Sequence, residues 1–424
     1  MKRLLAAAAV VAMSASAAPA APDPDDPGFS QQWGLKTMRV PQAWEASRGD
    51  GVIVAVVDTG VDAAHPDLKG RVLPGRDFVD DDADAADEKG HGTHVAGTIA
   101  ATTGNGVGIA SVSPGVKILP VRVLGADGEG DPGDVAGGIA WAVEQGARVI
   151  NLSLAQDDHL PVAGDALLRD TRVDRAIRKA AEDGAVVVVA AGNDDSGGKP
   201  QTAYDATVPG VLVVGATTRG DERAAYSNYG DGLDVVAPGG GTAADPKACA
   251  DPNWIVSTWW NPQTRKSDYG GGCGTSMAVA HVSGVASLLL ARGYSSAGAA
   301  KRIVDTAKDI GAPGRDVQTG NGRVDAMAAV GPLTATPRPT RSASSPTAAP
   351  SATTQGGLSG AGTPTATPTP TTIEPGPASP PQAAPPAEPA GRGGPITMAV
   401  VLMLAVMAAQ SRARARAGAG PPAG

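Results

Sequence analysis

Aromatic residues and cysteines are scarce in this chain of 424 residues. Phe, Trp and Tyr together make up 3% of the sequence. A core with so few rings must be packed from small branched side chains, which suits strands that are buried on both faces. The chain contains two cysteines, so one intramolecular disulfide at most can form.

Basic residues are too few to suggest a nucleic-acid partner. The chain holds 35 Lys and Arg against 43 Asp and Glu, a formal net charge of −8. Residues 331–424 are positive, with six Arg against two Glu, so the acidic excess falls on residues 1–330. Because phosphate binding needs clustered Lys and Arg, this composition argues against nucleic acid as a partner.

Residues 1–20 have the pattern of an export signal. Lys2 and Arg3 precede an apolar run at 4–13, and small residues follow up to Ala20. The alternative, a packed helix, would show an amphipathic pattern, and this run has none. We therefore expect an exported protein whose signal is cleaved near Ala20.

Export would permit a disulfide between the two cysteines, Cys249 and Cys273. Two free or reactive thiols are the alternative. Residues 21–50, between the signal and the first strong strand pattern, are expected to form a short leader and the first part of the folded domain.

Strand-like and helix-like segments alternate between residues 51 and 330. The β-branched run at 51–58 is typical of a strand buried on both faces. Further strands are expected at 117–124, 148–154, 185–190, 211–216 and 233–237. Helices are expected at 91–101, 134–145, 174–183, 276–292 and 296–306. This alternation predicts one doubly wound α/β domain with a mainly parallel sheet flanked by helices.

Two polar residues stand at the ends of expected strands. Asp58 ends the first strand, and Asn193 follows the strand at 185–190. Sites in open α/β sheets form at the carboxyl ends of strands, so a carboxylate and an amide donor there could belong to a site. Turn formation is the alternative role for both residues.

Histidines and a serine mark two expected helix starts. His91 and His94 could bind a metal together, but no Cys or Glu is placed to complete a zinc set. One histidine as a general base and the other packed in the fold is the better interpretation. Ser276 stands where glycines run into an apolar helix, which is the usual position of a capping serine.

Residues 77–88 hold seven carboxylates. So many like charges repel one another unless they are solvated or neutralised by a cation, and oxygen ligands suit a hard ion such as calcium. The spacing does not match a helix-loop-helix calcium site. A metal loop and a solvated acidic loop therefore remain equal alternatives.

The last quarter of the chain cannot build a core. Residues 331–394 are mainly Pro, Thr, Ala and Ser, a composition typical of a disordered linker. The apolar stretch at 395–411 is expected to insert into the membrane as a transmembrane segment. The Arg-rich tail at 412–424 would then stay in the cytoplasm and leave the folded domain outside the cell.

Asp58, His91 and Ser276 supply a carboxylate, an imidazole and a hydroxyl. A neutral imidazole can take the serine proton while the carboxylate orients it. With these three residues in this order, the chain resembles the subtilisin (subtilase) family of serine proteases over about residues 25–330. The matching motifs are Asp-Thr-Gly-Val at 58–61, His-Gly-Thr-His-Val-Ala-Gly at 91–97 and Gly-Thr-Ser-Met-Ala at 274–278.

The resemblance implies a subtilisin-type fold and a role for each site residue. Ser276 would be the nucleophile and His91 the general base and acid. Asp58 would orient His91, and Asn193 would stabilise the oxyanion. No cofactor is expected for catalysis. Two further segments resemble those that grip a polypeptide substrate as an added strand, and their residues are Leu124, Gly125, Leu152, Ser153 and Leu154.

The chain is most similar to thermitase-like members of the family, which bind calcium. The residues that fit their tight site are Asp26, Asp67 and Asn105, with backbone oxygens of Val107 and Ile109. A second set, consisting of Asp77, Asp80, Asp82 and Asp84, resembles a second site. The resemblance therefore implies structural calcium.

Three features depart from the family pattern. Ala280 stands where a Pro is usual, four residues after the nucleophile. The segment 240–253 resembles an insertion, and a bridge from its Cys249 to Cys273 would tie it beside the nucleophile. Residues 21–50 leave almost no room for the usual inhibitory propeptide.

The short leader, the linker and the apolar tail resemble mycosins, the membrane-anchored subtilases of type VII secretion systems. The tail also resembles a sorting signal that is later cleaved, which would leave the protein at the surface or secreted. We therefore expect an exported, membrane-anchored endopeptidase that acts on polypeptides. The alternative is an accessory component of a secretion system with a largely structural role and with other components of that system as partners.

Overall fold

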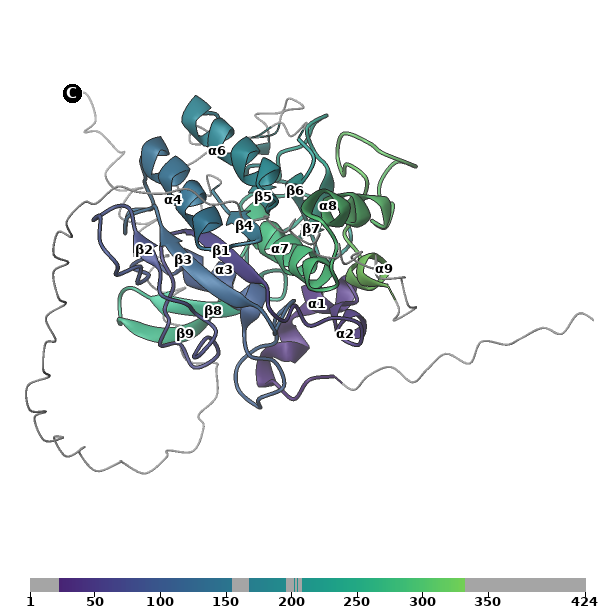
Figure 1. Cartoon of the computed structure of the whole chain (residues 1–424). Helices are drawn as coiled ribbons and strands as arrows, with labels where there is room; N and C mark the ends of the chain where they lie inside the picture. The colour runs from purple at the N-terminus through teal and green to yellow at the C-terminus, as the bar shows by residue number, and fades with distance from the viewer. Residues whose placement is uncertain (1–22, 155–167, 196–201, 203, 205–207, 332–424) are drawn as a thin grey trace, which may run out of the picture. The chain divides into compact units, whose positions relative to one another are not determined.

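The computed structural model describes residues 23–154, 168–195, 202, 204 and 208–331, all within one compact unit (Figure 1). The strands are β1 (Ile53–Asp58), β2 (Arg76–Asp77), β3 (Lys117–Arg122), β4 (Val149–Leu152), β5 (Val186–Ala190), β6 (Val211–Thr217), β7 (Val235–Pro238), β8 (Ile255–Asn261) and β9 (Lys266–Gly272). The longer helices are α3 (His91–Ala100), α4 (Pro132–Glu144), α6 (Thr171–Glu182), α7 (Thr275–Ala291) and α8 (Ser296–Asp305). The short helices are η1 (Pro27–Gln31), α1 (Trp33–Thr37), α2 (Val40–Ala43) and α9 (Ala326–Val330).

The central sheet has seven parallel strands in the order β2-β3-β1-β4-β5-β6-β7. The strands β3 and β2 lie on one side of β1, and the strands β4 to β7 follow in order on the other side. The direction in which strands are added therefore reverses between β3 and β4. The carboxyl ends of the strands beside this reversal are where ligands bind in open α/β sheets. The doubly wound α/β fold that the sequence predicts is confirmed.

Both faces of the sheet are buried, because successive residues of a strand enter different cores. In β5, Val186 and Val188 pack on one side, and Val187 and Val189 pack on the other. The helices α3 and α7 cover the first side, and α4 and α6 cover the second (Figure 1). Two helical layers therefore fix the strand ends in place.

The helix α7 runs through the first core, with every residue from Thr275 to Leu290 buried. Its N-cap is Gly274, which offers no capping side chain. Ser276 is the second residue of the helix and does not cap it, so the capping interpretation of this serine is wrong. The helix continues unbroken through Ala280, so the missing Pro does not interrupt it.

The antiparallel hairpin β8–β9 was not predicted, because the sequence of β9, Lys-Ser-Asp-Tyr-Gly-Gly-Gly, lacks an alternating apolar pattern. The hairpin packs on α3, where Thr258 Oγ1 donates to the backbone oxygen of Thr93 at 2.7 Å. A Cβ at Gly271 would lie 2.0 Å from the Trp254 ring, so this position has no room for a side chain. The hairpin therefore leads from the surface of α3 directly to the start of α7.

Across the part of the chain that the structure describes, no helix is both long and apolar enough to cross a bilayer. The expected signal at 1–20, the apolar segment at 395–411 and the tail at 412–424 lie outside the described residues, as does the expected linker from residue 332 onward. These expectations stay predictions.

Candidate active site

Asp58 and His91 form a buried pair at the carboxyl end of β1, an inner strand of the central sheet. Asp58 is the last residue of β1, and His91 is the first residue of α3. Asp58 Oδ1 lies 2.7 Å from His91 Nδ1, and the two side chains are 0% and 1% exposed. The backbone amide of Thr59 donates to the same carboxylate oxygen at 2.8 Å. A carboxylate at Nδ1 favours the tautomer in which Nε2 is the basic nitrogen.

A second carboxylate, from the acidic loop at 77–88, holds the start of α3. Asp87 accepts hydrogen bonds from the Gly90 amide at 2.8 Å, from Thr59 Oγ1 at 2.9 Å and from the Thr93 amide at 2.8 Å. Burial raises the pKa of Asp87, while these hydrogen bonds oppose the shift. The available signal was its place just before the helix that carries His91, where acidic side chains bind free amides.

Ser276 is held at the carboxyl end of β4. Its Oγ donates to the backbone oxygen of Ser153 at 3.1 Å, and Ser153 Oγ donates to the backbone oxygen of Ser276 at 3.1 Å. Asn151 Nδ2 donates to Ser153 Oγ at 2.9 Å. These reciprocal contacts bring the first turn of α7 to the strand next to the one that carries Asp58.

Asn193 presents a donor beside this turn. Its Oδ1 accepts from the amide of Thr275 at 2.8 Å and from Thr275 Oγ1 at 2.9 Å. The two donors identify the oxygen of the side chain, so Nδ2 is the group left to donate. Nδ2 is buried and has no hydrogen-bond partner among the described residues. This buried donor lies beside Thr275, the residue before Ser276. It can therefore bind a negative charge that forms next to Ser276.

Two other histidines are packed in the interior. His94 Nε2 lies 3.0 Å from the backbone oxygen of Ile255, and His281 Nδ1 lies 2.8 Å from that of Met277. Burial lowers the pKa of His94 to about 3 and that of His281 to about 4. Both rings are therefore neutral at ordinary pH.

The residues expected to grip a substrate lie at the ends of β3 and β4, on either side of β1. The side chains of Leu124, Leu152 and Leu154 are fully buried in the core beneath α4 and α6. Gly125 is half-buried, and its amide donates to the backbone oxygen of Glu129 at 2.9 Å. These segments can therefore offer a substrate backbone groups rather than leucine side chains.

The first residue set expected to bind calcium is gathered in one place. Asp26 Oδ1 accepts from the amide of Asn105 at 3.1 Å, and Asn105 Nδ2 donates to Asp67 Oδ1 at 3.3 Å. Asp67 Oδ2 accepts from the amide of Ile109 at 2.8 Å, and Val107 donates its amide to Asn105 Oδ1 at 2.8 Å. Both carboxylates are buried. Hard oxygen ligands brought together from three separate segments fit calcium.

The second set has a different partner. The Arg122 guanidinium, at the end of β3, contacts Asp77 and donates to Asp80 at 2.7 Å and to Glu88 at 2.6 Å. Asp82 instead accepts the amide of Asp84 at 2.8 Å. Within the described residues, no three His, Cys, Asp or Glu side chains form a metal site. Because a fixed cation already neutralises two of the four expected ligands, this set fits calcium poorly.

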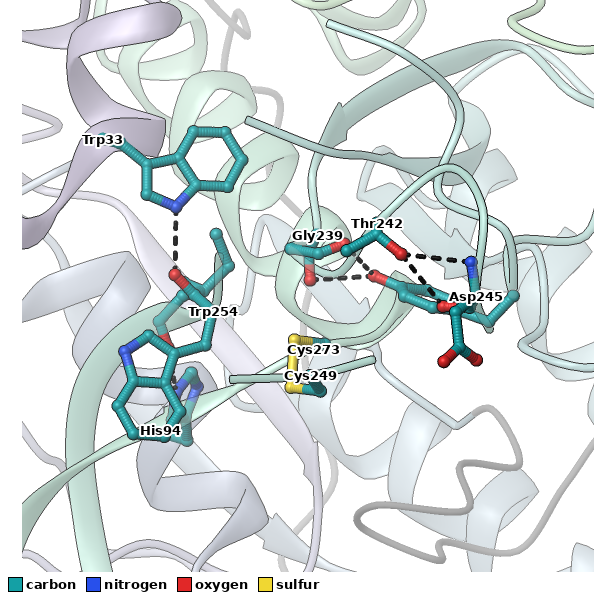
Figure 2. Close-up of a disulfide and its surroundings, with 11 residues drawn as sticks. Trp33, His94, Gly239, Thr242, Asp245, Cys249, Trp254 and Cys273 are labelled. Carbon is teal, nitrogen blue, oxygen red and sulfur yellow. Dashed lines mark hydrogen bonds between the residues drawn. A yellow bond between two sulfur atoms is a disulfide. The ribbon is translucent and has the colours of Figure 1, made fainter. Parts of the chain in front are cut away.

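Cys249 and Cys273 form a disulfide, with their Cα atoms 5.8 Å apart (Figure 2). The bridge is therefore confirmed over the alternative of two free thiols. Cys273 is three residues before Ser276, so the bridge joins the segment 240–253 to the turn that precedes α7.

A doubly wound α/β domain with a buried Asp–His pair, a serine at a helix start and an unpaired amide donor is built as a serine hydrolase. Comparison with known proteins makes this class specific. A model described as "Subtilase family" matches residues 49–322. The chain belongs to the subtilase family, and it is a subtilisin-like serine endopeptidase.

Thermitase from Thermoactinomyces vulgaris is 40% identical over 308 residues, which cover 72% of this chain and 99% of thermitase. The thermophilic serine proteinase of Bacillus sp. (strain AK1) is 41% identical over 284 residues, covering 67% of this chain and 63% of that protein. A solved structure of a protease from Pseudoalteromonas arctica PAMC 21717 has a TM-score of 0.62 at 33% identity, covering 73% of this chain and 99% of that one.

Proposed function

We propose that this endopeptidase cleaves polypeptides with Ser276 as nucleophile, His91 as general base and acid, Asp58 as its orienting carboxylate and Asn193 as an oxyanion donor. The observation that carries the proposal is the buried 2.7 Å contact between Asp58 Oδ1 and His91 Nδ1. A pair of this kind holds the imidazole in the tautomer that can accept a serine proton at Nε2.

Acylation would begin when Ser276 Oγ bonds to the carbonyl carbon of the scissile peptide and its proton passes to His91 Nε2. Asp58 stabilises the imidazolium that results. His91 then donates the proton to the leaving nitrogen, the C–N bond breaks, and the acyl group stays on Ser276. Water attacks this ester in the second half, with His91 again as base, and the free acid leaves as Ser276 regains its proton.

The oxyanion of each tetrahedral intermediate would be bound by Asn193 Nδ2 and by the backbone amide of Ser276. The first amides of a helix have no partner within the helix, and the helix dipole places partial positive charge there. The unpartnered Nδ2 of Asn193 supports this role. Donors fixed before the reaction stabilise charge without reorganising, which is the largest contribution in many enzymes of this kind.

The substrate would lie extended between the segments after β3 and β4. Their leucine side chains are buried, so recognition along the chain would use mainly backbone hydrogen bonds. This arrangement supports an enzyme that accepts many polypeptide sequences.

Hydrolysis of a peptide library by the purified full-length protein tests the proposal. The Ser276→Ala variant should lose cleavage, because it lacks the hydroxyl that would take up the acyl chain. Ser287→Ala is the matched control, since this serine lies on the same helix and bonds to Ser113 Oγ at 2.7 Å, away from the site. Cleavage by the Ser276→Ala protein at the wild-type rate would refute the assignment.

We propose further that calcium binds at Asp26, Asp67 and Asn105. The two buried carboxylates, which come from separate segments that meet at Asn105, support this assignment, and the ion would neutralise them. A bound ion adds about 2.7 kcal/mol of stability when its concentration is 100 times Kd.

Excess chelator should therefore lower the melting temperature by several degrees, measured with the Ser276→Ala variant so that the protein does not digest itself. Asp26→Asn should shrink this shift, and Asp84→Asn should leave it unchanged. A melting temperature that chelator does not change would speak against the calcium proposal.

We propose also that the protein is exported and anchored in the membrane. The pattern at 1–20, the disulfide in the fold and the apolar stretch at 395–411 before the arginines support this location. Names of similar proteins point both ways, because one is an "Extracellular protease" and another a "Major intracellular serine protease". Intact cells should expose the domain to added protease, and truncation after residue 394 should release it. A domain protected inside intact cells would contradict export.

A structural role in a secretion system is the rival to proteolysis as the biological task. Complementation of a deletion strain with Ser276→Ala separates the two. We expect the variant to fail, since the Asp58–His91 pair and the Asn193 donor are both in place. Full rescue by the variant would favour the structural role.

A further inference from the structure

The turn that leads into Ser276 has almost no side chains. Residues 270–274 read Gly-Gly-Gly-Cys-Gly, so Cys273 carries the only side chain among them. Glycine backbones have many accessible conformations, and such a run does not fix its own path. The N-cap Gly274 adds no capping bond from a side chain. The position of Ser276 therefore depends on contacts with other segments, which include its bonds to Ser153 and the pairing of residues 270–272 with β8.

One group of contacts comes from the segment after β7. The amide of Gly274 donates to the backbone oxygen of Gly239 at 2.9 Å. Tyr226 OH donates to the same oxygen at 2.9 Å and to that of Gly240 at 2.9 Å. Figure 2 shows Gly239 on the same side of the site as the Cys249–Cys273 disulfide. These bonds hold the backbone of the turn on one side.

The second contact is the disulfide itself. Cys273 is 1% exposed and belongs to the core that α7 crosses. A Cβ built on Gly240 would lie 3.1 Å from Cys273 Sγ, so the sulfur packs directly against the backbone of that segment. Cys249 is half-buried and packs against the same core. The bridge therefore closes the turn against the segment 240–253.

That segment is itself anchored at both ends. It contains no helix or strand, but its two ends are joined by a bond from the Gly241 amide to the Asn253 oxygen at 3.0 Å. Just beyond it, Trp33 Nε1 donates to the backbone oxygen of Trp254 at 3.0 Å (Figure 2). A covalent bond to such a segment transmits a fixed position to Cys273.

We propose that the Cys249–Cys273 disulfide is a positioning element of the active site. It fixes the Gly274 turn so that the Ser276 amide and Asn193 Nδ2 converge on one oxyanion. This inference rests on the proposed function of Ser276 and Asn193. The bridge touches neither substrate nor reacting atoms, and it acts only through the turn.

The proposal predicts a specific kinetic change. The oxyanion exists in the transition state and not in the bound substrate, so misplacing its donors lowers kcat and leaves KM nearly unchanged. Displacements of a fraction of an ångström cost less than loss of a donor, so we expect a fall in kcat on the order of tenfold when the bridge is broken.

The test compares the double variant Cys249→Ser, Cys273→Ser with wild type, by kcat and KM on a cleaved peptide. Asp245→Ala is the matched control, because Asp245 Oδ1 accepts the Lys247 amide at 2.9 Å within the same segment, and its loss leaves the bridge intact. The control should keep kcat within about twofold, since the bridge still fixes the turn.

The same comparison in an Asn193→Ala background separates positioning from simple stabilisation. Once that donor is gone, breaking the bridge should cost less than about twofold in kcat, because the two changes act on one interaction. An unchanged kcat in the double cysteine variant, with only a lower melting temperature, would overturn the proposal.

If the cysteine variant does not fold, wild type is reduced with dithiothreitol under native conditions and checked by circular dichroism. Folded, fully reduced enzyme with the wild-type kcat would equally overturn the proposal. Cleavage that survives in Ser276→Ala would instead refute the proposed function, whatever the bridge does.

Discussion

His91 and His94 lie one turn apart on the same helix, and both are buried, yet their surroundings are opposite. His91 faces the Asp58 carboxylate at 2.7 Å, whereas His94 faces the neutral backbone oxygen of Ile255 at 3.0 Å. A carboxylate stabilises an imidazolium in a desolvated site, and burial without such a partner lowers the pKa of His94 to about 3. The partner, rather than the residue type or its depth, therefore decides which histidine can carry a proton during catalysis.

The largest expected effect comes from His91→Ala. Peptide cleavage should fall by a factor on the order of 10⁴ or more, the size that triad substitutions show in subtilisins. The variant should also unfold more easily than Ser276→Ala, because the buried Asp58 carboxylate loses its partner, so kcat is measured on the folded fraction. Retention of a tenth of the wild-type kcat would break the comparison, because His91 would then not be the base.

His94→Ala should lose stability but keep its activity. Removing a fully buried ring leaves a cavity on α3 and removes the contact with the Ile255 oxygen, and we expect a loss of about 2–4 kcal/mol in the free energy of unfolding. Denaturant unfolding in the Ser276→Ala background measures it. The folded fraction of the otherwise wild-type enzyme should keep kcat within about threefold. A hundredfold loss of kcat at unchanged stability would assign His94 to the chemistry.

The most gradual effect is a loss of folding stability as the pH falls. The pKa values of His94 and His281 are lower in the folded state, about 3 and about 4, so the unfolded chain binds more protons below pH 6.5. Their contribution is full above pH 6.5 and is lost as the pH falls, by about 1.4 kcal/mol per histidine per pH unit. Between pH 6 and 4, a plot of the free energy of unfolding against pH should be less steep for His94→Ala than for wild type, by about 1.4 kcal/mol per pH unit. Parallel curves for the two proteins would contradict the buried, neutral state of His94.

Much of the fold could be predicted because it is local in origin. The β-branched runs specify buried strands, and the expected strand at 185–190 is observed as Val186–Ala190. The hairpin β8–β9 could not be predicted, because the glycines of β9 carry no pattern, and the need for glycine at 271 comes from the Trp254 ring packed against it. Tertiary contact decides the structure there.

The site, like the fold, contains residues that local sequence identifies and residues whose roles depend on tertiary contacts. Motif residues such as Asp58 and Ser276 could be assigned because their types and chain order carry the chemistry. Asp87 and Arg122 were not assigned, since their roles depend on partners distant in sequence: Asp87 binds Thr59, and Arg122 binds Asp77. Arg122 also explains how the carboxylates at 77–88 can lie close together, because its guanidinium supplies a cation to that loop.

Labelling with a fluorophosphonate probe tests the central claim most directly, because such probes react only with a serine activated by a neighbouring base. The full-length protein should form one adduct, which mass spectrometry should place on Ser276. His91→Ala should abolish labelling, and His94→Ala should retain it in the folded fraction. Labelling that persists in His91→Ala, or an adduct on another serine, would contradict the account.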